Sequence, residues 1–453
     1  MERMIQKIRS FQPGYTQVIA MGFAAVIVVA GMLLMLPVSA ADGQWTDPLT
    51  AFFTATSAVC VTGLVVADTA THWSIFGQWV LLVAIQIVGL GLMTVAALVM
   101  MMLRRRIGLA ERSLLQESVA SMSIGGIVRL TRRICVGTAA IEGTGALLLA
   151  MRFVPLFGWK RGLFYSVFHA ISAFCNAGFD LMGTYSGEYS SLTSFVGDPL
   201  VNLTVCTLIL VGGLGFFVWN DLYENKLRWH KYQLHTKLVL LLTAFFVIAA
   251  TVLFLVSERA HTFAPLGRAQ QLLAALFSAV TPRTAGFNTV DTAALSDGSI
   301  LLTLVLMIIG GNPGSTAGGM KTTTLLVVVL SARSMLFRRQ DVNVLGRRIE
   351  PETLRRASSV ATIYLSLCTL SALAILLIQP GLALRDVLFE VFSAVNTVGM
   401  STGVTRELSA LARLIIMALM FCGRMGSLTF ALMFTSRRKA APVQYPTEKI
   451  MVG

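Results

Sequence analysis

A glycine-rich stretch with a Lys-Thr pair, GGNPGSTAGGMKTTT at residues 310–324, holds the residue types of a phosphate-binding loop. The Walker A motif needs G-x-x-x-x-G-K-[ST], in which backbone N–H groups cradle phosphates and a glycine directly precedes the lysine. Here Met320 precedes Lys321, and Ser315 stands where the first glycine belongs. A strand should come before the loop, but both flanks, LLTLVLMII and LLVVVL, are strongly apolar. We therefore predict that no nucleotide binds to this chain.

The composition is that of a membrane protein. Of the 453 residues, 55% are hydrophobic and only 13% are charged, whereas soluble domains carry about 25% charged residues. Apolar runs of roughly 20 residues, the length that crosses a bilayer, recur between Tyr15 and Phe434. The sequence therefore predicts several spans in a lipid membrane. No small-residue cleavage site follows the first run, so we expect a first span and not a removed signal peptide.

The net charge of +14 is explained by topology better than by a nucleic-acid partner. Lysine and arginine gather in blocks before Tyr15 and within Arg104–Arg133, Lys226–Lys237, Arg333–Arg356 and Arg437–Lys449. These basic blocks follow every second long apolar stretch, as the positive-inside rule predicts for cytoplasmic loops. We therefore expect a cytoplasmic N-terminus and no nucleic acid as partner.

Four short segments of the chain resemble one another. They read LTAFFTATSAVCVTGL (49–64), GLFYSVFHAISAFCNAGF (162–179), QLLAALFSAVTPRTAGF (271–287) and LFEVFSAVNTVGM (388–400). Each has Phe and Ser-Ala, then small or polar residues, then a glycine and a large apolar residue. The glycines are Gly63, Gly178, Gly286 and Gly399. Even self-similarity of this kind indicates internal repeats.

A second landmark follows each of these glycines inside a long apolar stretch: VGLG (88–91), GGLG (212–215), GGNPG (310–314) and CGRMG (422–426). We predict four repeats of helix, re-entrant segment and glycine-kinked helix at residues 15–103, 131–223, 235–333 and 357–436, with a cytoplasmic tail at 437–453. For VGLG and GGLG, close helix packing is an alternative explanation of the glycines. The predicted fold class is an all-α membrane protein with four M1–P-loop–M2 repeats in pseudo-fourfold arrangement around a central pore.

The short segments cannot cross a hydrocarbon core of about 30 Å. Such a segment enters as a half-helix and returns as extended chain only where its backbone lines a water-filled cavity. Four of them around one axis form a ring of backbone carbonyls, which replaces the hydration shell of a cation. Glycine suits the narrowest point, because it tolerates positive φ and has no side chain to block the path. The hydroxyls of Thr62 and Thr397 are candidates for additional oxygen ligands.

In this setting the stretch 310–324 interrupts the second helix of the third repeat. Its glycines and proline oppose helix formation, and unwound backbone at membrane depth belongs beside water or inside protein. We predict an intramembrane gate below the ring of carbonyls, with a static packing kink as the alternative. Arg424, whose mid-helix charge usually marks function, is expected to face the carbonyls of this loop. The predicted gate residues are Gly310, Gly311, Asn312, Pro313, Gly314, Ser315, Thr316, Ala317, Gly318, Gly319, Lys321 and Arg424.

The motifs SAVCVTGL, ISAFCNAGFD, AVTPRTAGFNT and SAVNTVGMS, together with GGNPGSTAGGMKTTT, resemble the Trk/Ktr/HKT superfamily of potassium transporters. Only one helix precedes the first short segment, so the chain looks most like the bacterial KtrB-type membrane subunits. The third loop is longer between Ser278 and Gly286 than its counterparts, so its glycine is its best assigned residue. The resemblance implies a selectivity filter of Val59, Cys60, Val61, Thr62, Gly63, Cys175, Asn176, Ala177, Gly178, Arg283, Thr284, Ala285, Gly286, Val395, Asn396, Thr397, Val398 and Gly399.

The resemblance also implies a function and partners. Glycine at all four filter positions favours K⁺ over Na⁺, with K⁺ held in the pore and transport often dependent on Na⁺. Members of this type work as homodimers in the bacterial inner membrane. They bind a cytoplasmic ring of RCK (KtrA-type) subunits that sense ATP and ADP. The basic segment Arg338–Arg356 would then be docking surface, or it reflects topology alone.

Other polar residues are less informative. Glu142, in AAIEGTGALLL, is interpreted first as an acceptor for a neighbouring helix and second as a cation site. Lys321 lies near the inner end of its helix, where snorkelling is ordinary. The five histidines lack ligand spacing, and His169 is expected to pack. The six cysteines stand singly in apolar surroundings and are expected to be reduced. The sequence shows no Ser/His/Asp grouping or paired carboxylates and does not favour an enzyme.

Two other classes of function stay open. An inverted-repeat carrier with broken helices binds its substrate at the bilayer midplane, but such carriers lack four re-entrant segments. Comparing K⁺ flux with the flux of organic solutes separates the two. A membrane-embedded nucleotide-binding enzyme would require ATP to bind to the isolated chain.

Overall fold

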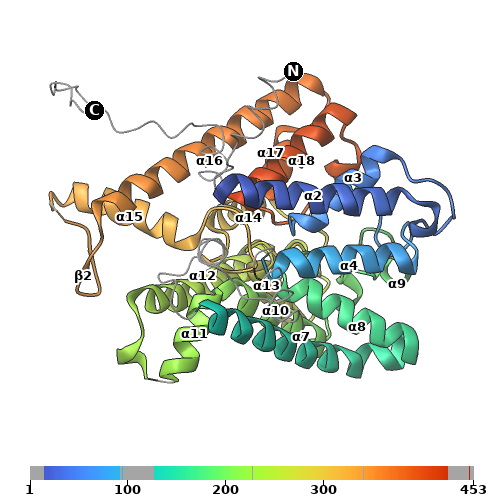
Figure 1. The fold of residues 1–453 in the computed structure, drawn as a ribbon, viewed down its shortest axis with the longest axis horizontal. Coiled ribbons are helices and arrows are strands. Elements are labelled where there is room, and N and C mark those ends of the chain that lie inside the picture. The colour runs from blue at the N-terminus through green and yellow to red at the C-terminus, as the bar shows by residue number, and fades with distance from the viewer. Residues whose placement is uncertain are drawn as a thin grey trace, which may run out of the picture.

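Helices make up nearly all of the regular secondary structure in the described part of the chain (Figure 1). The structure, a computed structural model, describes residues 15–91, 94, 127–226, 228–339, 341–426 and 448. The only strands in these ranges are β1 (Asn343–Val344) and β2 (Arg347–Arg348), which pair as an antiparallel hairpin. The all-α class predicted from the sequence is confirmed.

One long helix begins each repeat. Among the described residues, four helices have the length and hydropathy to cross a bilayer. Their outer faces are apolar: Phe245 and Val256 of the third are 62% and 74% exposed, as expected for side chains that face lipid. The four helices are α2 (Tyr15–Met35), α7 (Ile127–Phe157), α12 (Leu234–Glu258) and α16 (Pro351–Ile378).

One short helix follows each long helix and packs against it. These four are α3 (Pro48–Val59), α8 (Trp159–Phe174), α13 (Arg268–Val280) and α17 (Leu384–Val395). At 1.5 Å per residue none of them spans about 30 Å, so each enters the bundle only part of the way. In α3, the carboxylate of Asp47 caps the start by accepting from Thr50 N at 3.1 Å. The helix ends at Val59 because Val61 has a φ of +54°.

The second helix of every repeat ends at its glycine landmark. These helices are α4 (Ile75–Gly89), α10 (Pro199–Leu214), α14 (Asp297–Ile309) and α18 (Ala410–Met425). At Gly215, whose φ is +100°, the chain turns by 92° from α10 into α11 (Phe216–Asn225). In the third repeat α15 (Thr322–Leu336) resumes after a non-helical stretch. The sequence predicted kinks within continuous helices, and in the second and third repeats the structure has breaks.

The glycines at these landmarks also allow close packing. A Cβ added to Gly89 would lie 2.3 Å from Cys175 Sγ, and one added to Gly212 would lie 2.0 Å from Phe174 O. Both approaches bring the second helices against the C-terminal end of α8. The packing explanation of VGLG and GGLG is therefore correct for these two glycines.

Short connections complete the described chain. They contain η1 (Pro37–Ser39), α9 (Gly183–Ser186), η2 (Thr193–Phe195), η3 (Trp229–Lys231) and η4 (Val404–Arg406). The β1–β2 hairpin joins α15 to α16 and lies at one edge of the molecule (Figure 1). The predicted tail 437–453 lies outside the described residues except for Glu448. The repeat boundaries stay a prediction.

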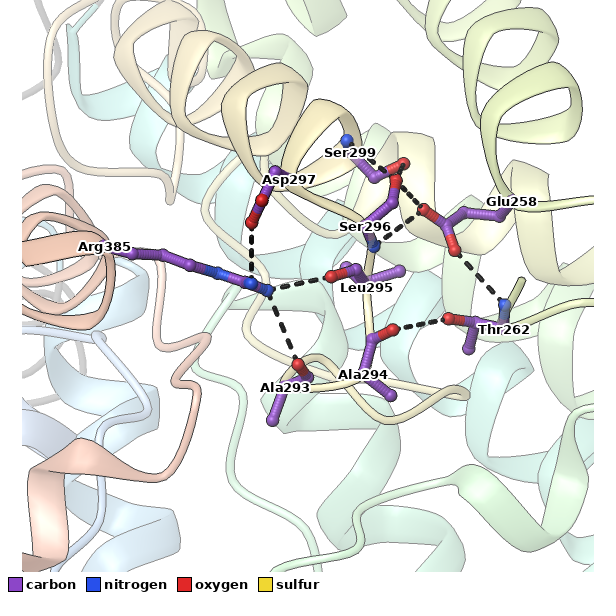
Figure 2. Close-up of polar contacts among 9 residues, drawn as sticks. All are labelled: Glu258, Thr262, Ala293, Ala294, Leu295, Ser296, Asp297, Ser299 and Arg385. Atoms are coloured by element: carbon purple, nitrogen blue, oxygen red, sulfur yellow. Dashed lines mark hydrogen bonds and ion pairs between the residues drawn. The ribbon is translucent and has the colours of Figure 1, made fainter. Parts of the chain in front are cut away.

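Glu258, the last residue of α12, anchors the start of α14 (Figure 2). It is fully buried, and its carboxylate accepts from Ser296 N at 3.0 Å and Ser296 Oγ at 2.5 Å. The other carboxylate oxygen accepts from Thr262 N at 3.3 Å. One acid therefore satisfies three donors of two connections.

Arg385 of α17 reaches the same segment from the fourth repeat (Figure 2). Its guanidinium lies 2.7 Å from Asp297 Oδ1 and donates to Leu295 O at 2.8 Å. The segment 293–297 is therefore held between the third and fourth repeats.

Substituting Glu258 by alanine is expected to lower the free energy of unfolding by about 2–4 kcal/mol, because buried donors would lose their charged acceptor. The measurement is thermal unfolding of the detergent-solubilised protein. Glu188→Ala, at an exposed acid in the connection after α9, is the control and is expected to change little. Equal unfolding temperatures for the two variants would show that Glu258 does not hold these connections.

Candidate functional site: four loops around one axis

Four loops follow the short helices and share one backbone conformation: loop 1 (Val59–Gly63), loop 2 (Cys175–Gly178), loop 3 (Arg283–Gly286) and loop 4 (Val395–Gly399). In each, the final glycine and the residue two positions before it have positive φ. The values are +54° and +96° at Val61 and Gly63, +58° and +70° at Asn176 and Gly178, +71° and +82° at Thr284 and Gly286, and +50° and +89° at Thr397 and Gly399. Positive φ is uncommon outside glycine and rare for β-branched residues. All four loops adopt this rare backbone conformation, so the residues packed around each loop must hold it in place.

The loop glycines contact one another in a closed ring. A Cβ added to any of them would meet the carbonyl of the residue before the glycine in the next loop. The distances are 2.6 Å from Gly63 to Ala177 O, 2.8 Å from Gly178 to Ala285 O, 2.8 Å from Gly286 to Val398 O and 2.0 Å from Gly399 to Thr62 O. The order runs from loop 1 to loop 4 and returns to loop 1. The loops therefore surround one axis, with no room for a side chain at the glycines.

Loop 3 has the same glycine end as the others despite its extra length. The short helix ends four residues before the glycine in loops 1, 2 and 4, and six residues before it in loop 3. The extra residues are taken up between Val280 and Thr284, where Arg283 N donates to Val280 O at 3.1 Å. The conformation from Thr284 to Gly286 is thus preserved.

All the residues predicted for the filter are buried except Gly399, which is half-buried. Serine hydroxyls behind loops 1 and 4 accept from the glycine N–H, at 3.1 Å for both Ser57–Gly63 and Ser393–Gly399. The hydroxyls of Thr62 and Thr397, proposed from the sequence as oxygen ligands, have no hydrogen-bond partner among the described residues.

An acidic cavity of about 270 Å³ opens on one side of the ring, and all four loop glycines line it. The carboxylates of Asp68, Asp180 and Asp291 are in its wall. One guanidinium, that of Arg406, also lines it and stacks over the Tyr189 ring at 4.3 Å. Three acids against one base make the cavity attractive to cations. Sequence reasoning did not bring these acids together, because they come from separate repeats.

The glycine-rich loop (Gly310–Lys321) leaves and re-enters the helices at one place. Thr322 N donates to Gly311 O at 3.0 Å, and Thr322 Oγ1 lies 3.1 Å from Ile309 O. The ends of α14 and α15 are therefore side by side, and the loop is an excursion between them. The break in helix predicted from the glycines and Pro313 is present.

On one side the glycine-rich loop contacts the second repeat. Thr316 Oγ1 donates to Phe174 O, at the end of α8, at 3.1 Å. Asn312 Nδ2 donates to Gly213 O at 2.8 Å. These contacts fix the loop against the end of α8 and the end of α10.

On the other side it contacts loop 4. Met320 N lies 3.4 Å from Asn396 Oδ1. A Cβ added to Gly318 would lie 2.0 Å from Thr397 Oγ1. The glycine-rich loop therefore reaches from the base of loop 2 to the base of loop 4.

Two cations hold this loop. Arg424, near the end of α18, donates to Thr316 O and, at 2.8 Å, to Val88 O of α4. The expected contact between Arg424 and the loop carbonyls is confirmed. Lys321 Nζ donates to Ala317 O at 2.7 Å and to Gly318 O at 3.1 Å. The snorkelling interpretation of Lys321 is wrong, because its ammonium turns back into the loop.

Two buried groups singled out in the sequence support loop 2. Glu142 of α7 accepts from Gln86 Nε2 of α4 at 3.0 Å, and Cys175 Sγ lies 3.9 Å from its other oxygen. The first interpretation of Glu142, as an acceptor for a neighbouring helix, is confirmed. His169 Nδ1 lies 2.7 Å from Tyr165 O, and its Nε2 accepts from Leu181 N at 3.3 Å. His169 therefore ties α8 to the chain after loop 2.

Sequence reasoning missed Glu390 of α17. This acid is 1% exposed and accepts from Ser401 Oγ at 2.9 Å and from Thr405 Oγ1. Both hydroxyl residues line the acidic cavity, so Glu390 fixes the wall above loop 4. The available signal was a carboxylate within the apolar segment LFEVFSAV.

Comparison with known proteins places this geometry in a family. Residues 9–441 match the TrkH family, whose description is cation transport protein. The Ktr system potassium uptake protein B of Bacillus subtilis is 40% identical over 455 residues, with 100% of this chain and 99% of that protein covered. The chain belongs to the TrkH family.

Other TrkH-family proteins are similar over nearly their whole length. The potassium/sodium uptake protein NtpJ of Enterococcus hirae is 38% identical, with 96% of this chain and 97% of that protein covered. The Ktr system potassium uptake protein B of Vibrio alginolyticus is 35% identical, with 97% and 95% covered. The crystal structure of the potassium transporter TrkH from Vibrio parahaemolyticus superposes with a TM-score of 0.73 at 17% identity, covering 93% of this chain and 84% of that one.

The TrkH fold confirms the predicted pseudo-fourfold arrangement of four repeats around a central pore. The family consists of membrane transporters and not of enzymes. The nucleotide-binding enzyme considered from the sequence is therefore excluded as a class.

Proposed function

We propose that this chain is the K⁺-translocating pore subunit of a Ktr-type potassium uptake system. The observation that carries the proposal is the closed ring of four loop glycines, each flanked by a second residue with positive φ. Relatives that match the whole chain are named as potassium uptake proteins. The mechanism of an inverted-repeat carrier does not require four such loops around one axis.

In this proposal loops 1 to 4 are the selectivity filter. Backbone carbonyls of the loops replace the hydration shell of K⁺, and the glycines keep the path free of side chains. The four short helices end at the loops, so the partial negative charge of each C-terminus faces the ion. The acidic cavity outside the ring raises the local concentration of cations.

The glycine-rich loop is the gate in this proposal. It contacts the base of loop 2 through Thr316 and the base of loop 4 through Gly318. Arg424 holds it closed through Thr316 O. Opening requires that these bonds break, and the φ values of +66° at Gly314 and +65° at Gly319 mark positions where the backbone moves without a side-chain clash.

We also propose the partners that the resemblance implied. The exposed basic segment Arg338–Arg356, with the β1–β2 hairpin in it, is the docking surface for a cytoplasmic RCK ring that binds ATP and ADP. The chain works as a homodimer in the bacterial inner membrane with its N-terminus in the cytoplasm. Na⁺ stimulates uptake, in keeping with a relative named as a potassium/sodium uptake protein.

The test is uptake of K⁺, Na⁺ and organic solutes into proteoliposomes that hold the purified chain. We expect uptake of K⁺ in preference to Na⁺ and no uptake of organic solutes. Uptake of an organic solute would favour the carrier. Absence of all flux, persisting after the partner ring is added, would contradict the pore.

Asp180 makes uptake sensitive to external pH. Burial, reinforced by the nearby carboxylate of Asp68, raises the pKa of Asp180 to about 7, although a hydrogen bond from Met182 N opposes the rise. Below that pH the carboxyl is protonated, and the cavity loses a negative charge. K⁺ uptake at sub-saturating concentration is expected to fall about two- to fivefold between pH 8 and pH 6.

Uptake by Asp180→Asn is expected to be low at both pH values and independent of pH. Asp291→Asn, which removes another acid of the same cavity, is the control and is expected to keep the pH step. A pH step of the wild-type size in Asp180→Asn would assign the sensitivity to another group.

A further inference from the structure

Arg283, the first residue of loop 3, is an unpaired buried cation. The residue is 5% exposed, and within the described residues the one hydrogen bond of its side chain runs from Nη2 to Thr243 Oγ1 at 3.4 Å. Nε and Nη1 have no partner. Within the described residues no carboxylate forms an ion pair with it. A buried guanidinium with unpaired donors is costly, so its presence beside the ring needs a reason.

The same Thr243 hydroxyl is contacted by Asn312 of the glycine-rich loop. Asn312 is fully buried, and its Nδ2 lies 3.5 Å from Thr243 Oγ1. Its Oδ1 has no partner. Thr243 of α12 therefore bridges loop 3 and the glycine-rich loop, two segments of the third repeat.

The unpaired groups on the two sides are complementary. Arg283 has free donors, Asn312 has a free acceptor, and both bonds to Thr243 are at the long end of the hydrogen-bond range. Arg283 Nη2 and Asn312 Nδ2 both lie within 3.5 Å of Thr243 Oγ1, so both side chains meet at one hydroxyl. The other three loops have no arginine at the corresponding position, and the other three repeats have no such insertion after the second helix.

We propose that Arg283 is a positioning residue that couples the gate to the filter. Through Thr243, movement of Asn312 is transmitted to Arg283 and from there to Thr284 and the carbonyls of loop 3. The position of the gate then changes the preference of the ring for K⁺ over Na⁺. This inference rests on the proposed function of the two segments.

The experiment compares the maximal K⁺ uptake rate and the K⁺-over-Na⁺ preference in proteoliposomes. The variants are Asn312→Ala and Thr243→Val, singly and together. We expect Asn312→Ala to change the preference about fivefold or more, a typical size for coupling between sites. In the Thr243→Val background, Asn312→Ala is expected to change the rate but leave the preference unaltered, because the bridge is already broken.

Two controls separate this coupling from a packing defect. Thr243→Ser restores the hydroxyl and is expected to restore the effect of Asn312→Ala on preference. Thr236→Val makes the same isosteric change on the same helix, at a buried hydroxyl that bonds to nothing, and is expected to leave the coupling intact. Each variant is first checked for folding by its unfolding temperature.

Arg283 itself is tested with lysine and methionine. Lysine keeps the charge but not the planar fork of donors, and we expect both Arg283→Lys and Arg283→Met to abolish the coupling. Wild-type coupling in Arg283→Lys alone would mean that charge is sufficient without the bridge, and wild-type coupling in both would mean that the side chain only packs. Either result overturns the proposal.

The failure of this inference is distinguishable from failure of the proposed function. Independent, multiplicative effects of Asn312→Ala and Thr243→Val on preference, with K⁺ flux and gating normal, would overturn the coupling alone. Absence of K⁺-selective flux in the wild type would overturn the pore itself.

Discussion

Replacing Gly399 by serine is expected to lower the preference for K⁺ over Na⁺ about tenfold or more, which is about 1.4 kcal/mol of differential binding. The new Cβ would lie 2.0 Å from Thr62 O, a backbone atom of loop 1. The φ of +89° at this position is also one that serine rarely adopts. Loop 1 or loop 4 has to move, and either shift displaces carbonyls of the ring. The measurement is competitive K⁺ and Na⁺ uptake in proteoliposomes.

The matched control for Gly399 is Gly187→Ser. Gly187 has a φ of +99° and no atom within 4 Å of an added Cβ, so it carries the backbone strain without the contact. We expect a modest loss of stability and unchanged preference. Gly286→Ser, with 2.8 Å to Val398 O, is expected to be less severe than Gly399→Ser. Unchanged preference in Gly399→Ser would count against loop 4 as part of the filter.

Deleting Gly314–Gly319 is expected to raise K⁺ flux about tenfold or more, because the proposed gate would have to break several hydrogen bonds of about 1 kcal/mol each to open. The deleted residues include Thr316, which bonds to Phe174 O and accepts from Arg424. The shortened chain closes without strain on the helices, since Thr322 N already reaches Gly311 O at 3.0 Å. Initial rates of Rb⁺ or K⁺ uptake give the result.

A milder variant guards this test against misfolding. Thr316→Val keeps the loop but removes the hydroxyl that bonds to Phe174 O, so it is expected to raise flux in the same direction by a smaller factor. Lower flux in both variants, with unfolding temperatures like that of the wild type, would assign the glycine-rich loop a structural role.

The repeats and the break in the third one were predictable because they depend on local sequence. Four glycines at even spacing and a run of glycines with Pro313 leave few alternatives for the backbone. The left-handed conformation of Val61, Thr284 and Thr397 was not predictable, since β-branched residues rarely adopt it. Contacts with the neighbouring loops impose this conformation, and those contacts cannot be predicted from the sequence of one loop alone.

The contacts of charged side chains were predictable only in part. The mid-helix position of Arg424 pointed to carbonyls of the glycine-rich loop, but its bond to Val88 O joins residues 336 positions apart. Lys321 was misinterpreted because the end of its helix was placed wrongly. It stands at the N-cap position of α15, directly after the break, and its ammonium donates to carbonyls of the preceding loop. Glu390 was missed because its partners lie beyond a loop whose path the sequence does not give.

The ring of glycines is built from one polypeptide, and this has an evolutionary consequence. In an assembly of identical subunits, a mutation near the axis is inherited by every quarter at once. Here each repeat is encoded separately, so one repeat can acquire an insertion or an arginine while the other three keep the shared loop conformation. Loop 3, with two more residues before its glycine than its counterparts, differs from the other three loops in this way. The four loop glycines do not have this freedom, because each packs against the backbone of the next loop and a side chain at any one of them would displace its neighbour.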